Sequence, residues 1–243
     1  MLLGCLSLYA ADNDLITRQI TITLEKAGTL PDRIASSKKN KITNLKIIGE
    51  INGTDLRMIR EMAGSNSNGN STDGKLSVLD LSEAKIVKGG DCYLNNGYDY
   101  TSNDVIGSRA FLGCSVLTSL TLPADITSIG DEAFQGCSGL TSIYVYAEKV
   151  PKIDSNAFKG VDAKKCTLYV PMGTYDDYWL SGFGDYFENI VEFEATGIDK
   201  TTISTDVEEV VRYSVNGQRL SAPTKGLNIV KYSDGSVKKV AVR

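Results

Sequence analysis

The chain has 243 residues, of which 42% are hydrophobic and 23% are charged, so it is long enough to bury a core in one or two domains. Its formal net charge is −4, whereas proteins that bind nucleic acid normally carry a basic stripe, so we expect no nucleic-acid partner. The chain contains no histidine, which removes the usual general base at neutral pH, the usual zinc ligand and every Ser/His or Cys/His nucleophile.

The N-terminal segment is apolar but short. Residues 2–12 (LLGCLSLYAAD) are too few to span a membrane, and no basic region precedes them. We interpret residues 1–11 as the end of a truncated signal peptide that is cleaved near Ala10 or Ala11. Two alternatives remain open: a lipobox, Leu2-Leu3-Gly4-Cys5, with an acylated Cys5, and a buried N-terminal strand or a mischosen start.

Residues 12–104 are predicted to form irregular opening coils with inserted loops. Alternating apolar residues predict a strand within residues 16–24, and two further strands are expected at 42–48 and 76–82. A helix is expected between the last two strands, where Gly53-Thr54-Asp55 forms a capping signal ahead of an apolar pattern with helical spacing.

An insertion rich in Gly, Asn and Tyr covers residues 88–104. Its side-chain oxygens offer ligands for calcium, but their spacing does not match an EF-hand loop, so we expect a solvated loop and no metal. The side chains concerned are Asp91, Asn95, Asn96, Asp99, Asn103 and Asp104.

The strongest pattern is an internal repeat. Segments 106–123 and 129–146 are identical at 10 of 18 aligned positions, and a degraded third copy follows at 153–171. Phe111, Phe134 and Phe158 recur at intervals of 23 and 24 residues, each followed two positions later by glycine. A period of 20–29 residues with leucines in fixed positions indicates a leucine-rich-repeat solenoid. We expect the three phenylalanines to stack in one interior column.

We therefore predict an α/β-type leucine-rich-repeat solenoid with one main sheet and an irregular outer face. Cys114 and Cys137 occupy equivalent positions in neighbouring coils, and Val161 takes that position in the third copy. Because valine fills the same position, we expect the two cysteines to be unlinked apolar residues of the repeat core. A disulfide between them is the alternative, and the cysteine spacing does not suggest a metal site.

In each coil, the segment ending in Leu-x-Leu-Pro should be a strand whose alternate residues point inward. The expected interior pairs are Leu45/Ile47, Leu79/Leu81, Leu120/Leu122, Ile143/Val145 and Leu168/Val170. The residues between them should face solvent: Lys46, Asp80, Thr121, Tyr144 and Tyr169. Stacked strands lie about 4.8 Å apart, so the two tyrosines should be neighbours. They suit protein or glycan contact, or else only shield the sheet.

An aromatic segment follows the repeats, with six aromatic residues between Tyr175 and Phe187. We interpret it as a cap on the last coil, so that repeats and cap occupy residues 105–194; an aromatic ligand platform is the alternative. Residues 195–243 are predicted to be a small all-β C-terminal module, because Asn216-Gly217 and Asp234-Gly235 stand at hairpin spacing.

The repeat I-G-x-x-A-F-x-G-C-x-x-L-T-S-I/L-x-L-P resembles that of BspA-like leucine-rich repeat proteins, which are exported surface proteins of Gram-negative anaerobes. The resemblance is specific over residues 105–171. Residues 211–243 resemble the short sorting or anchoring tails of exported proteins in the same bacteria. The resemblance implies export to the cell surface, an adhesin-like binding of proteins such as host extracellular matrix, and outer-membrane association through the tail or a lipid anchor.

The sequence thus favours a non-enzymatic surface protein, without cofactor or metal, that binds protein ligands through the sheet face. The candidate binding residues are Tyr144, Tyr169, Tyr146, Thr121, Asp80 and Lys46. The alternative is a carbohydrate-binding protein whose three tyrosines stack on sugar rings. An enzyme would need a carboxylate pair such as Asp176/Asp177 or Asp131/Glu132, and adjacent acids on a turn are usually only solvated.

Overall fold

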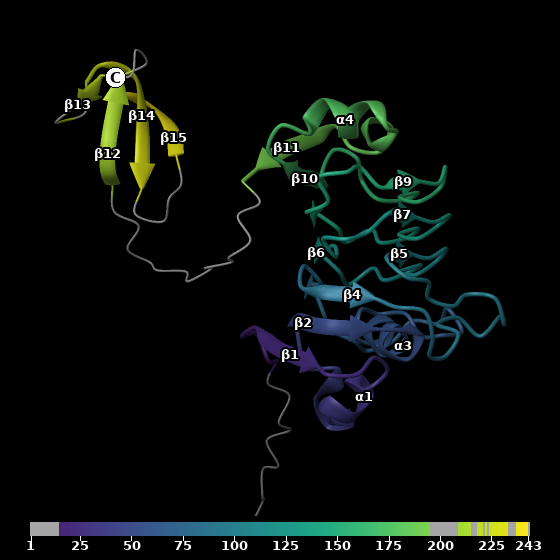
Figure 1. Cartoon of the computed structure of the whole chain (residues 1–243). Coiled ribbons are helices and arrows are strands. Elements are labelled where there is room, and N and C mark those ends of the chain that lie inside the picture. Colours follow the sequence, from purple (N-terminus) through teal and green to yellow (C-terminus); the bar gives the residue numbers. More distant parts are fainter. Residues whose placement is uncertain are drawn as a thin grey trace, which may run out of the picture. The chain divides into compact units, whose positions relative to one another are not determined.

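A computed structural model describes residues 15–194, 209–214, 218–220, 222, 224–232 and 237–242 of the chain (Figure 1). The chain divides into two compact units, Met1–Ala195 and Thr196–Arg243. The predicted signal segment 1–11 and the predicted turns Asn216-Gly217 and Asp234-Gly235 lie outside the described residues.

The first unit is built on an eight-stranded sheet whose strand pairs are all parallel. The strand order is β1-β2-β3-β6-β8-β10-β11, and β4 also pairs with β2. The strands are β1 (Ile20–Leu24), β2 (Asn44–Ile51), β3 (Val78–Asp80), β4 (Ala84–Ile86), β6 (Ser119–Thr121), β8 (Ser142–Tyr144), β10 (Thr167–Pro171) and β11 (Asn189–Phe193). All three strands predicted in the opening region are present, with boundaries shifted by a few residues.

A second parallel sheet contains β5 (Val105–Ile106), β7 (Ser128–Ile129) and β9 (Lys152–Ile153). Figure 1 shows these three short strands stacked one above the next beside the main sheet. Each copy of the repeat therefore contributes one strand to each sheet, and we call one such copy a coil.

The helices lie mainly at the two ends of this stack. They are α1 (Leu30–Arg33), α2 (Ser36–Lys39), α3 (Gly53–Met62), α4 (Tyr175–Leu180) and the 3-10 helix η1 (Phe183–Asp185). The predicted helix is α3, but its N-cap is Asn52, one residue before the predicted signal. The Asn52 side chain accepts from the Thr54 amide, and Asp55 accepts from the Asn52 amide, which completes a capping box.

The interior of the coils is filled by the aligned apolar positions. All ten side chains of the expected interior pairs are fully buried. Phe111, Phe134 and Phe158 form a buried column with ring centroids 5.3 and 5.1 Å apart and planes within 9° of parallel. The glycine two residues after each ring has a φ of +73°, +76° or +86°, a conformation that side chains with a Cβ rarely adopt. This explains why glycine returns with each phenylalanine.

Backbone hydrogen bonds join each coil to the next. The amides of Phe111 and Gly113 donate to the carbonyls of Ala133 and Gln135 at 2.7 and 2.8 Å. One coil later, the amides of Phe134 and Gly136 donate to Ala157 and Lys159 at 2.7 and 3.1 Å. The carbonyls of every coil thus depend on amides of the coil before it, because a buried carbonyl without a donor is costly.

The first coil receives its donors from a side chain. Its equivalent carbonyls belong to Ala110 and Leu112, and the guanidinium of Arg60, in α3, donates to them at 2.9 and 3.2 Å. It also donates to the Arg109 carbonyl at 3.0 Å and to Ser65 Oγ at 3.2 Å. Arg60 is fully buried, and desolvation lowers its pKa from the usual value. Arg60 therefore takes the place of a preceding coil.

The last coil is covered by the aromatic segment. Phe183 and Phe187 are buried, and their ring centroids lie 5.8 and 5.0 Å from that of Phe158. Tyr178, in α4, is also buried, and its hydroxyl donates to the Ala147 carbonyl at 2.6 Å. These contacts give the aromatic segment the role of a cap, since they close the end of the phenylalanine column.

The second unit is a small antiparallel sheet of order β13-β12-β14-β15. Its strands are β12 (Glu209–Ser214), β13 (Arg219–Leu220), β14 (Gly226–Tyr232) and β15 (Val237–Val242). Arg212 on β12 and Asn228 on β14 are buried, and Arg212 Nη1 donates to Asn228 Oδ1 at 3.1 Å. The Asn228 amide group in turn donates to the Thr224 carbonyl at 2.8 Å.

Replacing Phe134 with alanine should remove the middle ring of the column and leave a cavity. We expect the free energy of unfolding to fall by about 3–5 kcal/mol, as for other large-to-small core substitutions. Chemical denaturation followed by circular dichroism measures this change. Tyr98→Ala, at an 85% exposed position, serves as the control and should stay within about 0.5 kcal/mol of wild type. Equal stability of the two variants would contradict the interior column.

Replacing Arg60 with methionine should leave the first coil's carbonyls without donors. We expect a loss of about 3–5 kcal/mol, because the carbonyls of Arg109, Ala110 and Leu112 lose a donor and each unsatisfied buried group costs about 1–3 kcal/mol. Arg57→Met in the same helix is the control, because Arg57 is only half-buried, and its cost should stay below about 1 kcal/mol. An Arg60→Met protein with the wild-type denaturation midpoint would show that the first coil needs no donor from α3.

Candidate functional site

The strand register gathers one outward position from every coil into a continuous row. Cα pairing connects β1 to β2, β2 to β3, and so on through β11 without a shift along this row. The row contains Thr21, Lys46, Asp80, Thr121, Tyr144, Tyr169 and Val191. Its chemistry changes from charged through hydroxyl to aromatic and apolar, so different parts of the sheet face suit different contacts.

Lys46 and Asp80 are less accessible than the sequence predicts. Lys46 Nζ lies 3.2 Å from Asp80 Oδ2 and 2.9 Å from Glu83 Oε1, and Lys46 and Asp80 are each only 8% exposed. Burial lowers the pKa of Lys46, but the hydrogen bond to Glu83 and the charge of Asp80 outweigh it, so the pKa lies above its usual value. The expectation that both residues face solvent is wrong, because they neutralise each other across neighbouring strands.

Tyr144 and Tyr169 lie side by side on the sheet. Their ring centroids are 4.3 Å apart and their planes are within 7° of parallel. Both side chains are half-buried. Burial, with further contributions from the charge of Tyr169 and a hydrogen bond to it, raises the pKa of the Tyr144 hydroxyl above its ordinary value, so this hydroxyl remains protonated at neutral pH.

Phe193, at the end of β11, joins the two tyrosines to Tyr146. Its ring stands edge-on to Tyr144 at 5.9 Å and to Tyr146 at 5.0 Å, with interplanar angles of 83° and 81°. We call Tyr144, Tyr146, Tyr169 and Phe193 the aromatic cluster. Sequence reasoning missed Phe193; its only signal is its position in the last strand, where it pairs with Pro171.

The surroundings of the aromatic cluster differ on its two sides. Val191 follows Tyr169 in the row and is 44% exposed, so it extends the apolar surface toward the last strand. Thr121 precedes Tyr144 and is half-buried. The aromatic cluster is thus bordered by an apolar residue and a hydroxyl residue, neither of them charged.

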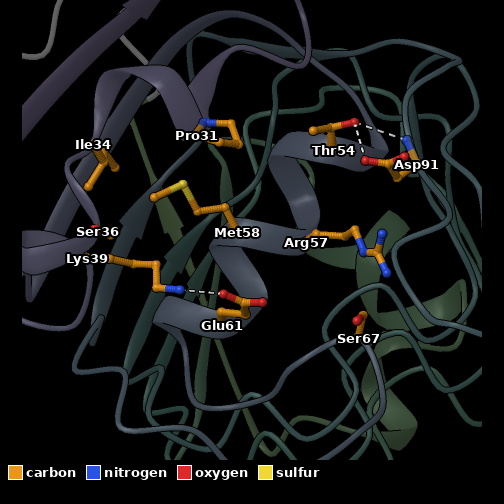
Figure 2. A pocket seen from close by; sticks show the side chains of 10 residues that line it. All are labelled: Pro31, Ile34, Ser36, Lys39, Thr54, Arg57, Met58, Glu61, Ser67 and Asp91. Atoms are coloured by element: carbon orange, nitrogen blue, oxygen red, sulfur yellow. Dashed lines mark hydrogen bonds and ion pairs between the residues drawn. The ribbon is translucent and has the colours of Figure 1, made fainter.

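A groove of about 440 Å³ lies between α3, the α1–α2 region and the insertion (Figure 2). Figure 2 shows that several polar side chains lining it point toward one another. Lys39 Nζ lies 2.6 Å from Glu61 Oε2, and Thr54 Oγ1 donates to Asp91 Oδ2 at 3.0 Å. Lys39 and Glu61 therefore neutralise each other, whereas the charged groups of Arg57 and Asp91 contact the neutral side chains of Asn95 and Thr54.

The oxygen-rich insertion is engaged with the protein itself. Asp91 binds Thr54, Asn103 Oδ1 accepts from the Lys88 amide at 2.8 Å, and the nearly buried Asp99 lies 3.3 Å from Arg109. Within the described residues, no group of three His, Cys, Asp or Glu side chains is arranged to hold a metal ion.

The two candidate carboxylate pairs sit on the surface of the stack. Asp176 and Asp177 are exposed in the first turn of α4. Asp131 accepts a hydrogen bond from Asn156 at 2.9 Å, and Glu132 is half-buried on the same turn with a φ of +55°. Both pairs are therefore placed like solvated turn residues.

The cysteines of the repeat are buried and unlinked. Cys114, Cys137 and Cys166 are fully buried, and no disulfide joins the four cysteines that the structure describes. Burial raises the pKa of the Cys114 and Cys166 thiols to about 12. The Cys137 thiol, whose pKa burial also raises, donates to the Phe111 carbonyl at 3.1 Å. Because the thiolate is the reactive form, these three side chains are unsuited to nucleophilic chemistry at neutral pH.

A thiol-labelling experiment tests this assignment. In the folded protein at pH 8, a thiol reagent should label Cys92, which is partly exposed, and should reach Cys114, Cys137 and Cys166 only after denaturation. Peptide mass spectrometry identifies the labelled positions. Cys137→Val should fold with near-wild-type stability, and a reducing agent should leave the melting temperature unchanged. A melting temperature that falls on reduction would instead show that a disulfide stabilises the protein.

The repeat matches a known family. The family model of the BspA type leucine rich repeat region matches residues 104–210 in six copies. This match extends past the three copies that are visible by eye and reaches the start of the second unit. Among curated proteins, no relative matches the chain. In the described part of the chain, no helix has the length and apolar character needed to cross a membrane.

Proposed function

We propose that the chain is an exported, surface-associated solenoid of the BspA leucine-rich repeat type, which its residues 104–210 match, and that it binds a protein ligand through the outer face of its main sheet. The stacked Tyr144–Tyr169 pair carries this proposal. Leucine-rich repeats generally mediate protein interactions and offer an extended surface rather than a deep pocket.

The interior positions stabilise the coils, which leaves the outer positions available to a ligand. On β8, Ile143 is fully buried while its neighbour Tyr144 is only partly buried, and β10 repeats this arrangement with Leu168 and Tyr169. Tyrosine supplies a large, rigid contact area at a low cost in side-chain entropy. The aromatic cluster thus has the composition of an interface centre.

The ring orientations favour a protein ligand over a sugar. A sugar ring packs flat against an open aromatic face, but Tyr144 and Tyr169 turn one face toward each other. Phe193 stands edge-on to Tyr144 and Tyr146. Edges and hydroxyl groups can donate hydrogen bonds to peptide carbonyls while the rings contact apolar side chains.

Residues of low charge around the aromatic cluster support the same proposal. Val191 and Thr121 flank the two tyrosines in the row, and Lys46 and Asp80 further along neutralise each other. Interfaces commonly place their strongest contacts centrally and surround them with residues that mainly exclude water. The expected partner is a protein of the extracellular matrix or of another cell surface.

Surface attachment is the second part of the proposal. It rests on the apolar residues 2–12 and on the second unit, whose residues 210–243 contain seven Lys/Arg and one acid. We propose that residues 195–243 are a separate module for sorting or anchoring, and that residues 1–11 end a signal peptide or carry a lipid.

Truncating both stacked tyrosines tests the binding proposal. The Tyr144→Ala/Tyr169→Ala protein should keep most of its stability and lose about 2 kcal/mol of binding free energy, roughly a 30-fold rise in Kd. Purified extracellular matrix proteins on a biosensor provide the assay, with a glycan array in parallel. The matched control is Tyr98→Ala/Tyr100→Ala in the insertion, where both tyrosines are exposed.

Unchanged affinity in the Tyr144/Tyr169 variant would refute the sheet-face site. Loss of affinity in the Tyr98/Tyr100 variant alone would move the site to the insertion. Binding to glycans but not to proteins, abolished by the Tyr144/Tyr169 variant, would assign the same residues to carbohydrate recognition.

A further inference from the structure

The core of the first unit is incomplete at both ends. One inward row of the main sheet runs from Ile20 on β1 to Ile190 on β11 through the central strands. The five central residues of this row are fully buried, whereas Ile20 and Ile190 are only partly buried. β1 and β11 each have one strand neighbour in the described sheet, so each leaves one edge available for another strand.

The end formed by β1, α1 and α2 is apolar and basic. A groove of about 380 Å³ lies there, and its apolar lining is Ile16, Ile20, Ile22, Ile34, Ala35 and Ile42. Three cations, Arg18, Arg33 and Lys38, line the same groove. Residues 15–43 contain six Lys/Arg and two Asp/Glu.

The opposite end, formed by α4, η1 and β11, is apolar and acidic. Its exposed apolar side chains include Trp179, 43% exposed, and Leu180, 82% exposed. Tyr175 stacks on Trp179 with the ring centroids 6.2 Å apart, so these two aromatic side chains form one surface. Residues 172–194 contain six Asp/Glu and no Lys/Arg.

We propose that a second copy of the chain docks end to end, with the acidic α4–β11 end of one molecule on the basic β1–α1–α2 groove of the next. The two surfaces are opposite in charge, and each presents apolar side chains that water would otherwise contact. All strands of the main sheet run parallel, so β11 of one copy can lie beside β1 of the next in the same direction as every other pair.

Charge also opposes the symmetric arrangements. Two β1–α1–α2 ends face to face would bring together two segments that each carry a net charge of +4, from six Lys/Arg and two Asp/Glu, and two α4–β11 ends would oppose six acids with six acids. A head-to-tail contact leaves one groove and one α4–β11 end free in every assembly. Such a heterologous contact that does not close into a ring produces an open series of oligomers. This association is independent of the ligand proposed for the aromatic cluster.

Two variants, each disabling one end, test the arrangement in the full chain. The first is Trp179→Ala/Leu180→Ser, and the second is Arg18→Glu/Arg33→Glu; all four residues belong to the exposed class, so both proteins should fold. Sedimentation velocity over a range of concentrations should show wild-type species heavier than two 26.3 kDa chains. Each variant alone should associate at least tenfold more weakly.

An equimolar mixture of the two variants gives the decisive result. The intact groove of the first variant can accept the intact α4–β11 end of the second, so the mixture should form dimers and nothing larger. Tyr98→Ser, at an exposed site on the insertion, should assemble like wild type, as should Tyr144→Ala/Tyr169→Ala, which separates this proposal from the proposed function.

Three outcomes of the full-chain measurements would overturn the proposal. These are a wild-type protein that stays monomeric at all concentrations, a closed dimer whose mass does not grow with concentration, and a variant mixture that forms long oligomers. A further test uses a shortened chain that begins at residue 15. If this chain associates and the full chain does not, the groove binds residues 1–14 of the same molecule, and the proposal is also overturned.

Discussion

The structure of the first unit depends on hydrogen bonds between coils, because the buried carbonyls of every coil need N–H donors from outside that coil. The carbonyls of Ala133 and Gln135 accept from amides one coil earlier, and without those amides they would be buried and unpaired. A single coil is therefore unstable by itself, and the stack must begin with something other than a coil. Arg60 fills that role, because its planar guanidinium presents several donors from one buried position. A lysine, with a single nitrogen, cannot reach carbonyls on both sides of this turn.

The same dependence fixes the period of the repeat. Threonine hydroxyls add a second set of contacts between coils: Thr118 donates to the Ser77 carbonyl at 3.1 Å, and Thr141 donates to the Thr118 carbonyl at 3.0 Å. Since inward apolar side chains, left-handed glycines and these hydroxyls occupy set places, an insertion within a coil would break several contacts together. The outward position of each strand is not one of these repeated positions. Its residue can therefore change from lysine to tyrosine along the row.

The sequence predicts the parts of the fold that repeat and misses the parts that occur once. Period and alternation locate the three phenylalanines and the inward leucines, because each position is supported by equivalents in other coils. The burial of Arg60 has no periodic counterpart, so nothing in the sequence separates it from the half-buried Arg57. The predicted strands place Lys46 and Asp80 at equivalent outward positions, but the ion pair that withdraws both from solvent is seen only in the structure. Phe193 was missed because β11 follows the recognisable copies.

A stack of coils has two different ends, and at each end the apolar core lacks a further coil to cover it. On the loop side, Arg60 closes the first coil, and Phe183 and Phe187 close the last one. On the sheet side, β1 and β11 keep a free edge and a partly buried apolar residue. The feature that lets coils add within one chain therefore also lets chains add to one another. End-to-end assembly would place copies of the aromatic cluster along a shared sheet, and a ligand with several equivalent sites would then bind with avidity that one weak contact does not provide.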